Sequence, residues 1–163
     1  MRHIVALKMT EIDFALSQEE DTEIIELVGI VLWNKASEVK EFSELSQPEQ
    51  TFIYIDIFES ELIHGGLFDF FYNTSGAYAH EVLDAFAAIG AIESTEYIHQ
   101  AIKSIPILPV PKDIFERRSV MNQLPESTTI IWETLETSLL NSEEDIATLI
   151  INYVTLHKTF FEY

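Results

Sequence analysis

The feature that constrains the fold most is the stretch IHGGLFDFFYNTSG at residues 63–76, which holds three of the five glycines and a dense aromatic cluster. The adjacent Gly65 and Gly66 predict a sharp corner between two helices, because glycine adopts positive φ without a steric penalty. Three apolar residues after the corner have the i, i+3, i+4 spacing of one buried helical face: Leu67, Phe70 and Phe71. Turn-forming residues at 73–76 predict a second corner, in which glycine and short polar side chains tolerate the left-handed conformation.

Hydrophobic periodicity extends the helical interpretation to the rest of the chain and predicts an all-α fold of about seven or eight helices. The expected helices cover about 18–34, 48–65, 77–89, 94–105, 112–124 and 129–140, with a last one from Ile146 towards Phe160. The alternation at 51–58 also fits a strand, but the apolar pattern continues to Gly65 and is too long for one. We expect a single compact domain over 1–163. The sequence does not decide the structure of residues 1–16, where 3–7 fit a short strand and 12–16 a helical turn.

Serine and proline residues predict where several helices begin. Ser17 with Glu20 has the pattern of a capping box for the helix at 18–34. Ser94 is expected to start the next helix after Gly90, and Ser142 with Asp145 to cap the last helix. Three prolines forbid regular helix and predict an extended connector: Pro106, Pro109 and Pro111.

The chain is strongly acidic, with 28 Asp and Glu residues against nine Lys and Arg and a formal net charge of -19. Such an excess repels nucleic acid and anionic membranes and attracts cationic partners. Lys and Arg are absent between Lys8 and Lys35, where seven acids occur, and from Glu41 to Ile102, where eleven occur. Helix faces usually mix both signs, because i, i+4 ion pairs stabilise a helix. These windows therefore favour a selected negative surface over the alternative of acidity for solubility alone.

Acidic residues that lie opposite the apolar helical stripes are the candidate partner-binding residues: Glu19, Glu23, Glu26, Glu49, Asp56, Glu59, Glu81 and Asp84. A compact domain of this length is roughly 40 Å across. Duplex DNA carries on the order of 23 negative charges over that distance, which is similar to the net charge here. One acidic helix is too sparsely charged to imitate DNA. Two or three acidic helices side by side, or a homodimer that extends the face, would come closer.

The sequence offers little for catalysis, and we expect no enzyme, no metal site and no cofactor. Cysteine is absent, and no phosphate-binding glycine loop or nucleophile elbow occurs. A hydrolase or metal protein would have to use His64 with Asp69, or His80 with Asp84. The competing interpretation places His64 at a helix end, Asp69 in solvent and the second pair on a polar helix face. No apolar run is long enough for a membrane helix or signal core, so we expect a cytoplasmic protein.

The glycine-aromatic stretch also resembles the signature of a bacterial family of acidic DNA mimic proteins. The positions that match, which we expect to be structural, are Gly65, Gly66, Phe70, Phe71 or Tyr72, Asn73 and Gly76. His64, Leu67 and Asp69 depart from the asparagine, phenylalanine and glutamine that are usual there. A weaker match at the C-terminal end comprises Glu144-Asp145-Ile146, Tyr153, His157 and Phe160, so the resemblance runs from about Phe52 to the end.

This resemblance implies a non-enzymatic protein that occupies the DNA site of a basic DNA-binding protein, such as a transcription regulator. Its binding residues would be carboxylates, because Lys and Arg clusters that hold phosphate are attracted by negative charge in general. An immunity protein or inhibitor of a basic toxin, such as a nuclease, is the alternative, since the same acidity would serve it.

Overall fold

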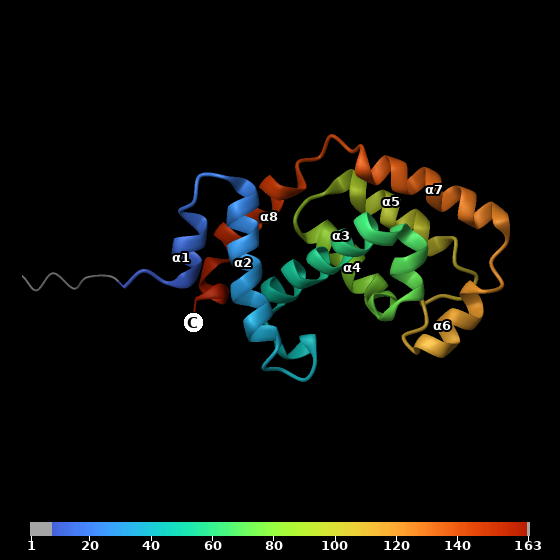
Figure 1. The fold of residues 1–163 in the computed structure, drawn as a ribbon, viewed down its shortest axis with the longest axis horizontal. Coiled ribbons are helices and arrows are strands. Elements are labelled where there is room, and N and C mark those ends of the chain that lie inside the picture. Colours follow the sequence, from blue (N-terminus) through green and yellow to red (C-terminus); the bar gives the residue numbers. More distant parts are fainter. Residues whose placement is uncertain (1–7, 163) are drawn as a thin grey trace, which may run out of the picture.

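A computed structural model describes residues 8–162, which form eight α-helices and three short 3-10 helices and contain no β-strand (Figure 1). The all-α prediction is thereby confirmed, whereas the strand considered at 3–7 lies outside the described residues. The α-helices are α1 (Glu11–Leu16), α2 (Asp21–Ala36), α3 (Gln47–Tyr72), α4 (Ala79–Ala88), α5 (Ile92–Lys103), α6 (Ile114–Met121), α7 (Glu126–Leu140) and α8 (Ile146–Leu156). The 3-10 helices are η1 (Phe42–Glu44), η2 (Thr74–Tyr78) and η3 (Lys158–Phe161).

Helix α3 is the centre of the fold and contacts α2, α4, α6, α7 and α8. The pair α1 and α2, together with α8, packs around one end of α3, and α4 to α7 surround its other end (Figure 1). The aromatic side chains that α3 contributes to the core are almost fully buried: Phe52, Phe58, Phe70 and Phe71. Burying an aromatic side chain of this kind stabilises a fold by about 1.5–3 kcal/mol, so α3 contributes strongly to the core on both sides of the corner.

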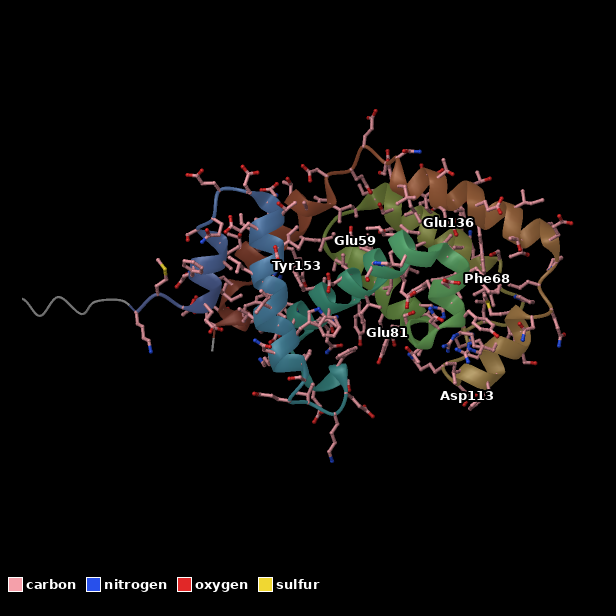
Figure 2. All side chains as sticks on the ribbon, in the orientation of Figure 1. Glu59, Phe68, Glu81, Asp113, Glu136 and Tyr153 are labelled. Atoms are coloured by element: carbon pink, nitrogen blue, oxygen red, sulfur yellow. The ribbon has the colours of Figure 1, made fainter. Side chains whose placement is uncertain are left out.

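The predicted glycine corner is present within α3, at Gly66, whose φ of 74° and ψ of -167° interrupt the helix. Glu136 of α7 lies beside it (Figure 2) and accepts a hydrogen bond of 2.6 Å from the backbone N–H of Leu67. A Cβ atom on Gly66 would collide with this carboxylate. The corner therefore depends on a residue that tolerates positive φ and leaves room for a cap from another helix.

The apolar wedge after the corner is buried as predicted, with Leu67, Phe70 and Phe71 each at most 1% exposed. The ring of Phe71 stacks on Trp132 of α7, with ring centroids 4.9 Å apart. The ring of Phe70 meets Phe58 edge-on at 5.0 Å. These geometries are the ones that aromatic pairs favour. The wedge thus joins the two halves of α3 to α7.

A buried arginine caps the C-terminal end of α3. Arg117 of α6 is 1% exposed and donates to the backbone carbonyls of Phe71 (2.6 Å) and Asn73 (2.7 Å). Its guanidinium also donates to the carbonyls of Pro111 (2.8 Å) and Lys112 (3.0 Å) in the proline-rich connector. A cation is favourable at a helix C-terminus, where the last carbonyls have no partner in the helix. Arg117 therefore fixes both the end of α3 and the path of the connector.

The second corner is formed for a different reason from the one predicted. Only Gly66 and Gly90 have positive φ among the described residues, so Gly76 does not need the left-handed conformation. A Cβ atom on Gly76 would instead lie 2.5 Å from Nε of Arg117, where there is no space for it. The carboxylate of Glu61 closes the corner by accepting hydrogen bonds from Asn73 (3.2 Å) and Ser75 (2.9 Å).

The capping box predicted at Ser17 is wrong. The hydroxyl of Ser17 donates to the carbonyl of Phe14 at 2.7 Å and thus belongs to the end of α1, while α2 begins only at Asp21. Capping boxes do form at the start of α1, between Thr10 and Asp13, and at the start of α3, where Ser46 and Glu49 each bond the backbone N–H of the other. Serine patterns at helix starts and helix ends look alike in a sequence, and only the fold separates them.

The predicted starts of α5 and α8 also need correction. Helix α5 begins at Ile92, so Ser94 lies inside its first turn and is buried. Helix α8 is capped by Asp145, whose carboxylate accepts from the backbone N–H of Thr148 at 3.0 Å, and Ser142 lies outside the cap. Both serines instead make contacts between helices, which are described below.

Candidate functional site

Carboxylates gather along the edge of the molecule where α2, α5 and α8 begin (the upper edge in Figure 2). We call this surface the acidic edge. It consists of Glu19, Glu20 and Asp21 at the start of α2, Glu93 at the start of α5, and Glu143, Glu144 and Asp145 before α8. Six of these seven side chains are exposed and Glu144 is partly buried. Three segments that are distant in the sequence therefore present their acids together.

Glu144 joins two of these segments, because it caps the start of α5 from outside that helix. Its carboxylate accepts from the backbone N–H groups of Glu93 (2.6 Å) and Ser94 (2.9 Å) and from the hydroxyl of Ser94 (2.8 Å). Ser142 donates in turn to the carboxylate of Glu93 at 3.1 Å. The first N–H groups of an α-helix have no partner within it, and here a carboxylate of the neighbouring segment supplies one.

Asp145 and Asp21 bring the third segment into the acidic edge. The hydroxyl of Thr148 lies 2.9 Å from Oδ2 of Asp145 and 3.5 Å from Oδ2 of Asp21. The hydrogen bonds from the backbone N–H and the hydroxyl of Thr148 lower the pKa of Asp145 below its ordinary value. Both aspartates are therefore held at neighbouring helix starts, α2 on one side and α8 on the other.

No ion pair within residues 8–162 connects a lysine or arginine to the acidic edge. The ion pairs that form join Lys35 to Glu49, Lys112 to Glu81, and Lys158 to Asp13 and Glu162. Helix N-termini carry a partial positive charge and unpaired N–H groups, which favour nearby carboxylates. Three helix starts thus stabilise the acidic edge in place of cations, and its negative charges stay available at the surface.

We predict that Glu144→Gln destabilises the protein by about 1–2 kcal/mol at neutral pH, because an amide is a weaker acceptor at a helix start. Burial raises the pKa of Glu144, but the hydrogen bonds from Ser94 and Glu93 outweigh it and the net pKa is lowered. A lowered folded-state pKa means that the stabilisation is complete above the unfolded-state pKa and is lost as pH falls through the folded-state pKa.

Urea unfolding at pH 7 and pH 4 measures this effect, and the difference in unfolding free energy between wild type and Glu144→Gln should be smaller at pH 4. Glu143→Gln, an exposed neighbour, should change stability by less than about 0.5 kcal/mol; equal losses would contradict the cap.

The structure does not bring all eight predicted partner-binding residues onto one surface. Glu19 belongs to the acidic edge, and Glu23 and Glu26 are exposed further along α2. Asp84 is exposed on α4, which packs around the other end of α3 (Figure 1). The residues of α2 are therefore the part of the predicted set that lies on or next to the acidic edge.

Two of the predicted residues are neutralised by lysines, and Glu49 needs correction. Glu49 is 1% exposed, and its carboxylate lies 2.6 Å from Nζ of Lys35, so no partner can reach it. Burial raises the pKa of Glu49, but the bonds from Lys35 and Ser46 outweigh it, so the net pKa is lowered. Glu81 (Figure 2) accepts a hydrogen bond of 2.6 Å from Nζ of Lys112. Its charge is therefore partly cancelled at the surface.

The remaining two predicted residues lie in partly buried positions on α3. Asp56 accepts a hydrogen bond of 2.7 Å from the indole N–H of Trp33. Burial, together with the charge of Asp56, raises the pKa of Glu59 to about 7. Glu59 is therefore only partly ionised at neutral pH. Two acids of α3 are thus covered by side chains of α2: Glu49 by Lys35 and Asp56 by Trp33.

The two His–Asp pairs are not joined by hydrogen bonds in the described part of the chain. His64 lies at the helix end before the corner, with Nδ1 2.6 Å from the carbonyl oxygen of Ser60. His80 accepts from the backbone N–H of Val110 at 2.9 Å and so holds the proline-rich connector. Residues 8–162 contain no group of three or more His, Asp or Glu side chains arranged to hold a metal ion.

Within the same residues, every helix is too short or too polar to span a lipid bilayer.

The partner-binding residues predicted from the sequence include only one member of the acidic edge, Glu19. A local signal existed, since two runs of three acids, at 19–21 and 143–145, each stand directly before an apolar helical stripe. Such runs are typical of helix starts. That the two runs and Glu93 meet at one edge depends on how α2, α5 and α8 pack, which periodicity does not reveal.

Comparison with known protein families gives a match over most of the chain. The sequence model of the family described as DMP19-like protein matches residues 43–157, more than half of the chain. The match takes in α3 to α8 and the glycine-aromatic stretch at 63–76, and it begins after α2. Comparison with curated proteins and with solved structures gives no significant match. The chain belongs to the DMP19-like protein family.

Proposed function

We propose that this protein is a non-enzymatic DNA mimic that acts in the cytoplasm, and that its acidic edge occupies the DNA-binding surface of a basic protein such as a transcription regulator. Membership of the DMP19-like family supports this role, because that family is one of DNA mimic proteins. The net charge of -19 supports it as well, since it disfavours nucleic acid and favours cationic partners.

Carboxylates from three separate helix starts gather on one surface, and no lysine or arginine of residues 8–162 forms an ion pair with them. This observation carries the proposal. Duplex DNA presents about one negative charge per 1.7 Å of its axis, a density that a single acidic helix does not reach. The acidic edge places seven carboxylates on three neighbouring segments. Lys and Arg side chains that bind DNA phosphates would find several carboxylates close together on this surface. Arg would bind a carboxylate through paired hydrogen bonds.

We predict that neutralising the acidic edge weakens partner binding by about tenfold or more at 0.1 M salt, since each lost charge contact removes a few tenths to 1 kcal/mol. The variant is Glu19→Gln, Glu20→Gln and Glu143→Gln combined, because these side chains are exposed and form no hydrogen bond that shapes the fold. Binding to transcription regulators from the same genome is measured by titration from 0.05 to 0.5 M salt, with a cognate DNA duplex as competitor. The affinity should fall steeply with salt, and the duplex should displace the protein.

The matched control neutralises three exposed acids elsewhere, Glu38→Gln, Glu126→Gln and Glu133→Gln, and changes the net charge by the same amount. It should retain wild-type affinity within about threefold. Equal losses in both variants would show that overall charge alone acts and that the acidic edge is not the site. An affinity that does not change with salt concentration would refute mimicry. So would a regulator that binds this protein and the DNA duplex at the same time. Binding confined to a basic toxin would replace this proposal by a toxin inhibitor.

A further inference from the structure

A second surface lies on the pair of helices α1 and α2, apart from the acidic edge. A hollow of about 410 Å³ is lined by residues of α1, of α2 and of the segment just before α1. A second hollow is lined by residues of α2 and by Asp56 of α3. Ile30 and Asn34 line both, and we call the two hollows together the hairpin groove. Its main apolar side chains are Met9, Phe14, Leu27, Ile30, Val31 and Trp33.

The hairpin groove exposes an unusual amount of apolar surface. Met9 is 62% exposed, Phe14 54%, Ile30 53% and Trp33 37%. Large apolar side chains that are exposed around one depression mark a contact surface, whereas singly scattered ones do not. The hydrogen bond of 2.7 Å from Trp33 to Asp56 holds the indole ring in the wall of the groove. Tryptophan held in place in this manner is a frequent anchor in protein interfaces.

Among residues 8–162, the charged side chains that line the hairpin groove are all acidic: Glu11, Glu26 and Asp56. Of the lysines close to it in the sequence, Lys8 lines a neighbouring hollow with Asp13, and Lys35 pairs with Glu49. An apolar floor with a carboxylate rim is complementary to a ligand with an apolar stripe flanked by Lys and Arg.

We propose that the hairpin groove binds a basic amphipathic helix of a partner protein. Apolar residues of that helix at i, i+3, i+4 and i+7 would pack on Phe14, Ile30 and Trp33, and its Lys and Arg side chains would pair with the carboxylate rim. A second copy of this chain fits less well, because its net charge of -19 would place two acidic rims against each other.

This inference goes beyond the proposed function, because it uses none of the residues of the acidic edge. The family match begins at residue 43, so α1 and α2 lie outside the segment that the chain shares with its family. Apart from Asp56, the residues that line the hairpin groove therefore lie outside the matched segment.

The test uses two synthetic peptides of 18 residues and identical Leu, Lys and Arg composition. In one the leucines form a single helical stripe, and in the other they are spread around the helix. Trp33 reports binding directly, because the other tryptophan, Trp132, is 1% exposed and already shielded from water. The striped peptide should bind at least about tenfold more tightly than the spread one and shift the Trp33 emission to shorter wavelength.

Ile30→Asp should weaken binding of the striped peptide at least about tenfold, since it places a charge on the apolar floor. The matched control is Ile63→Asp, which is 72% exposed on α3 and lines no part of the groove, and it should bind as wild type. Equal affinity for the two peptides, or wild-type affinity of Ile30→Asp, would overturn the proposal. So would a dimer in sedimentation that Ile30→Asp dissociates. The variant that combines Glu19→Gln, Glu20→Gln and Glu143→Gln should bind the striped peptide with wild-type affinity. The peptide experiment therefore tests the hairpin groove independently of the DNA-mimic proposal.

Discussion

Replacing Arg117 with alanine is expected to destabilise the protein by about 3–5 kcal/mol, because it leaves several buried carbonyl groups without a donor. The guanidinium satisfies carbonyls of Phe71 and Asn73 at the end of α3 and two more in the connector. Relief from burying a charge offsets part of this loss. Since folded domains are stable by about 5–15 kcal/mol, the variant should be substantially unfolded in mild urea, as followed by circular dichroism.

Two further variants separate the cap from a general effect of charge. Arg118→Ala removes the neighbouring cation, which donates to the carbonyl of Tyr72 at 2.9 Å and lies over the Tyr72 ring, and it should cost only about 1 kcal/mol. Arg117→Lys keeps the charge but cannot reach all four carbonyls, so its stability should lie between that of Arg117→Ala and wild type. A loss below 1 kcal/mol for Arg117→Ala would show that water replaces the guanidinium and that the cap is dispensable.

Phe71→Ala is expected to cost about 3–5 kcal/mol, the range for removing a large aromatic side chain from a packed core. Phe71 is 1% exposed and stacks on Trp132, so the variant opens a cavity between α3 and α7. Phe70→Ala should behave alike, because it removes the contact with Phe58. Denaturant unfolding gives the free energy, and the emission of Trp132 should move to longer wavelength as water reaches the indole.

Phe68→Ala is the matched control, since Phe68 belongs to the same turns of α3 but is 38% exposed. Its loss should stay below about 1.5 kcal/mol, because the residue is already partly in contact with water and its ring stacks on the partly exposed Tyr72. If Phe71→Ala cost no more than Phe68→Ala, the wedge would not support the corner as described.

Local patterns were sufficient to predict the helices and the corner. The spacing of Leu67, Phe70 and Phe71 places them on one face in any helix, and adjacent glycines have few other uses between two helical patterns. Proline likewise excluded helix from the connector without any knowledge of its neighbours. Helical spacing, adjacent glycines and proline each act on the backbone within a few residues, so their effects can be predicted from the local sequence.

The groups that complete the fold and the candidate site come from distant parts of the chain and could not be predicted in this way. Glu136, Arg117 and Glu144 each cap a helix other than their own. A capping side chain that lies more than 40 residues away in the sequence leaves no periodic pattern. The last helix is predicted to run from Ile146 towards Phe160, but α8 ends at Leu156 and the following η3 places Phe161 in the core.

The hydrogen bonds from backbone N–H groups to Glu144 and Asp145 affect the free energy of binding a partner. A flexible acidic side chain loses rotamer freedom when a partner immobilises it, at about 0.5–1.5 kcal/mol each. These two carboxylates already form hydrogen bonds to backbone N–H groups at the starts of α5 and α8, so less of this freedom remains to be lost on binding. A partner that meets this surface therefore encounters a rigid template of charge, and its own arginines and lysines must do most of the adjusting.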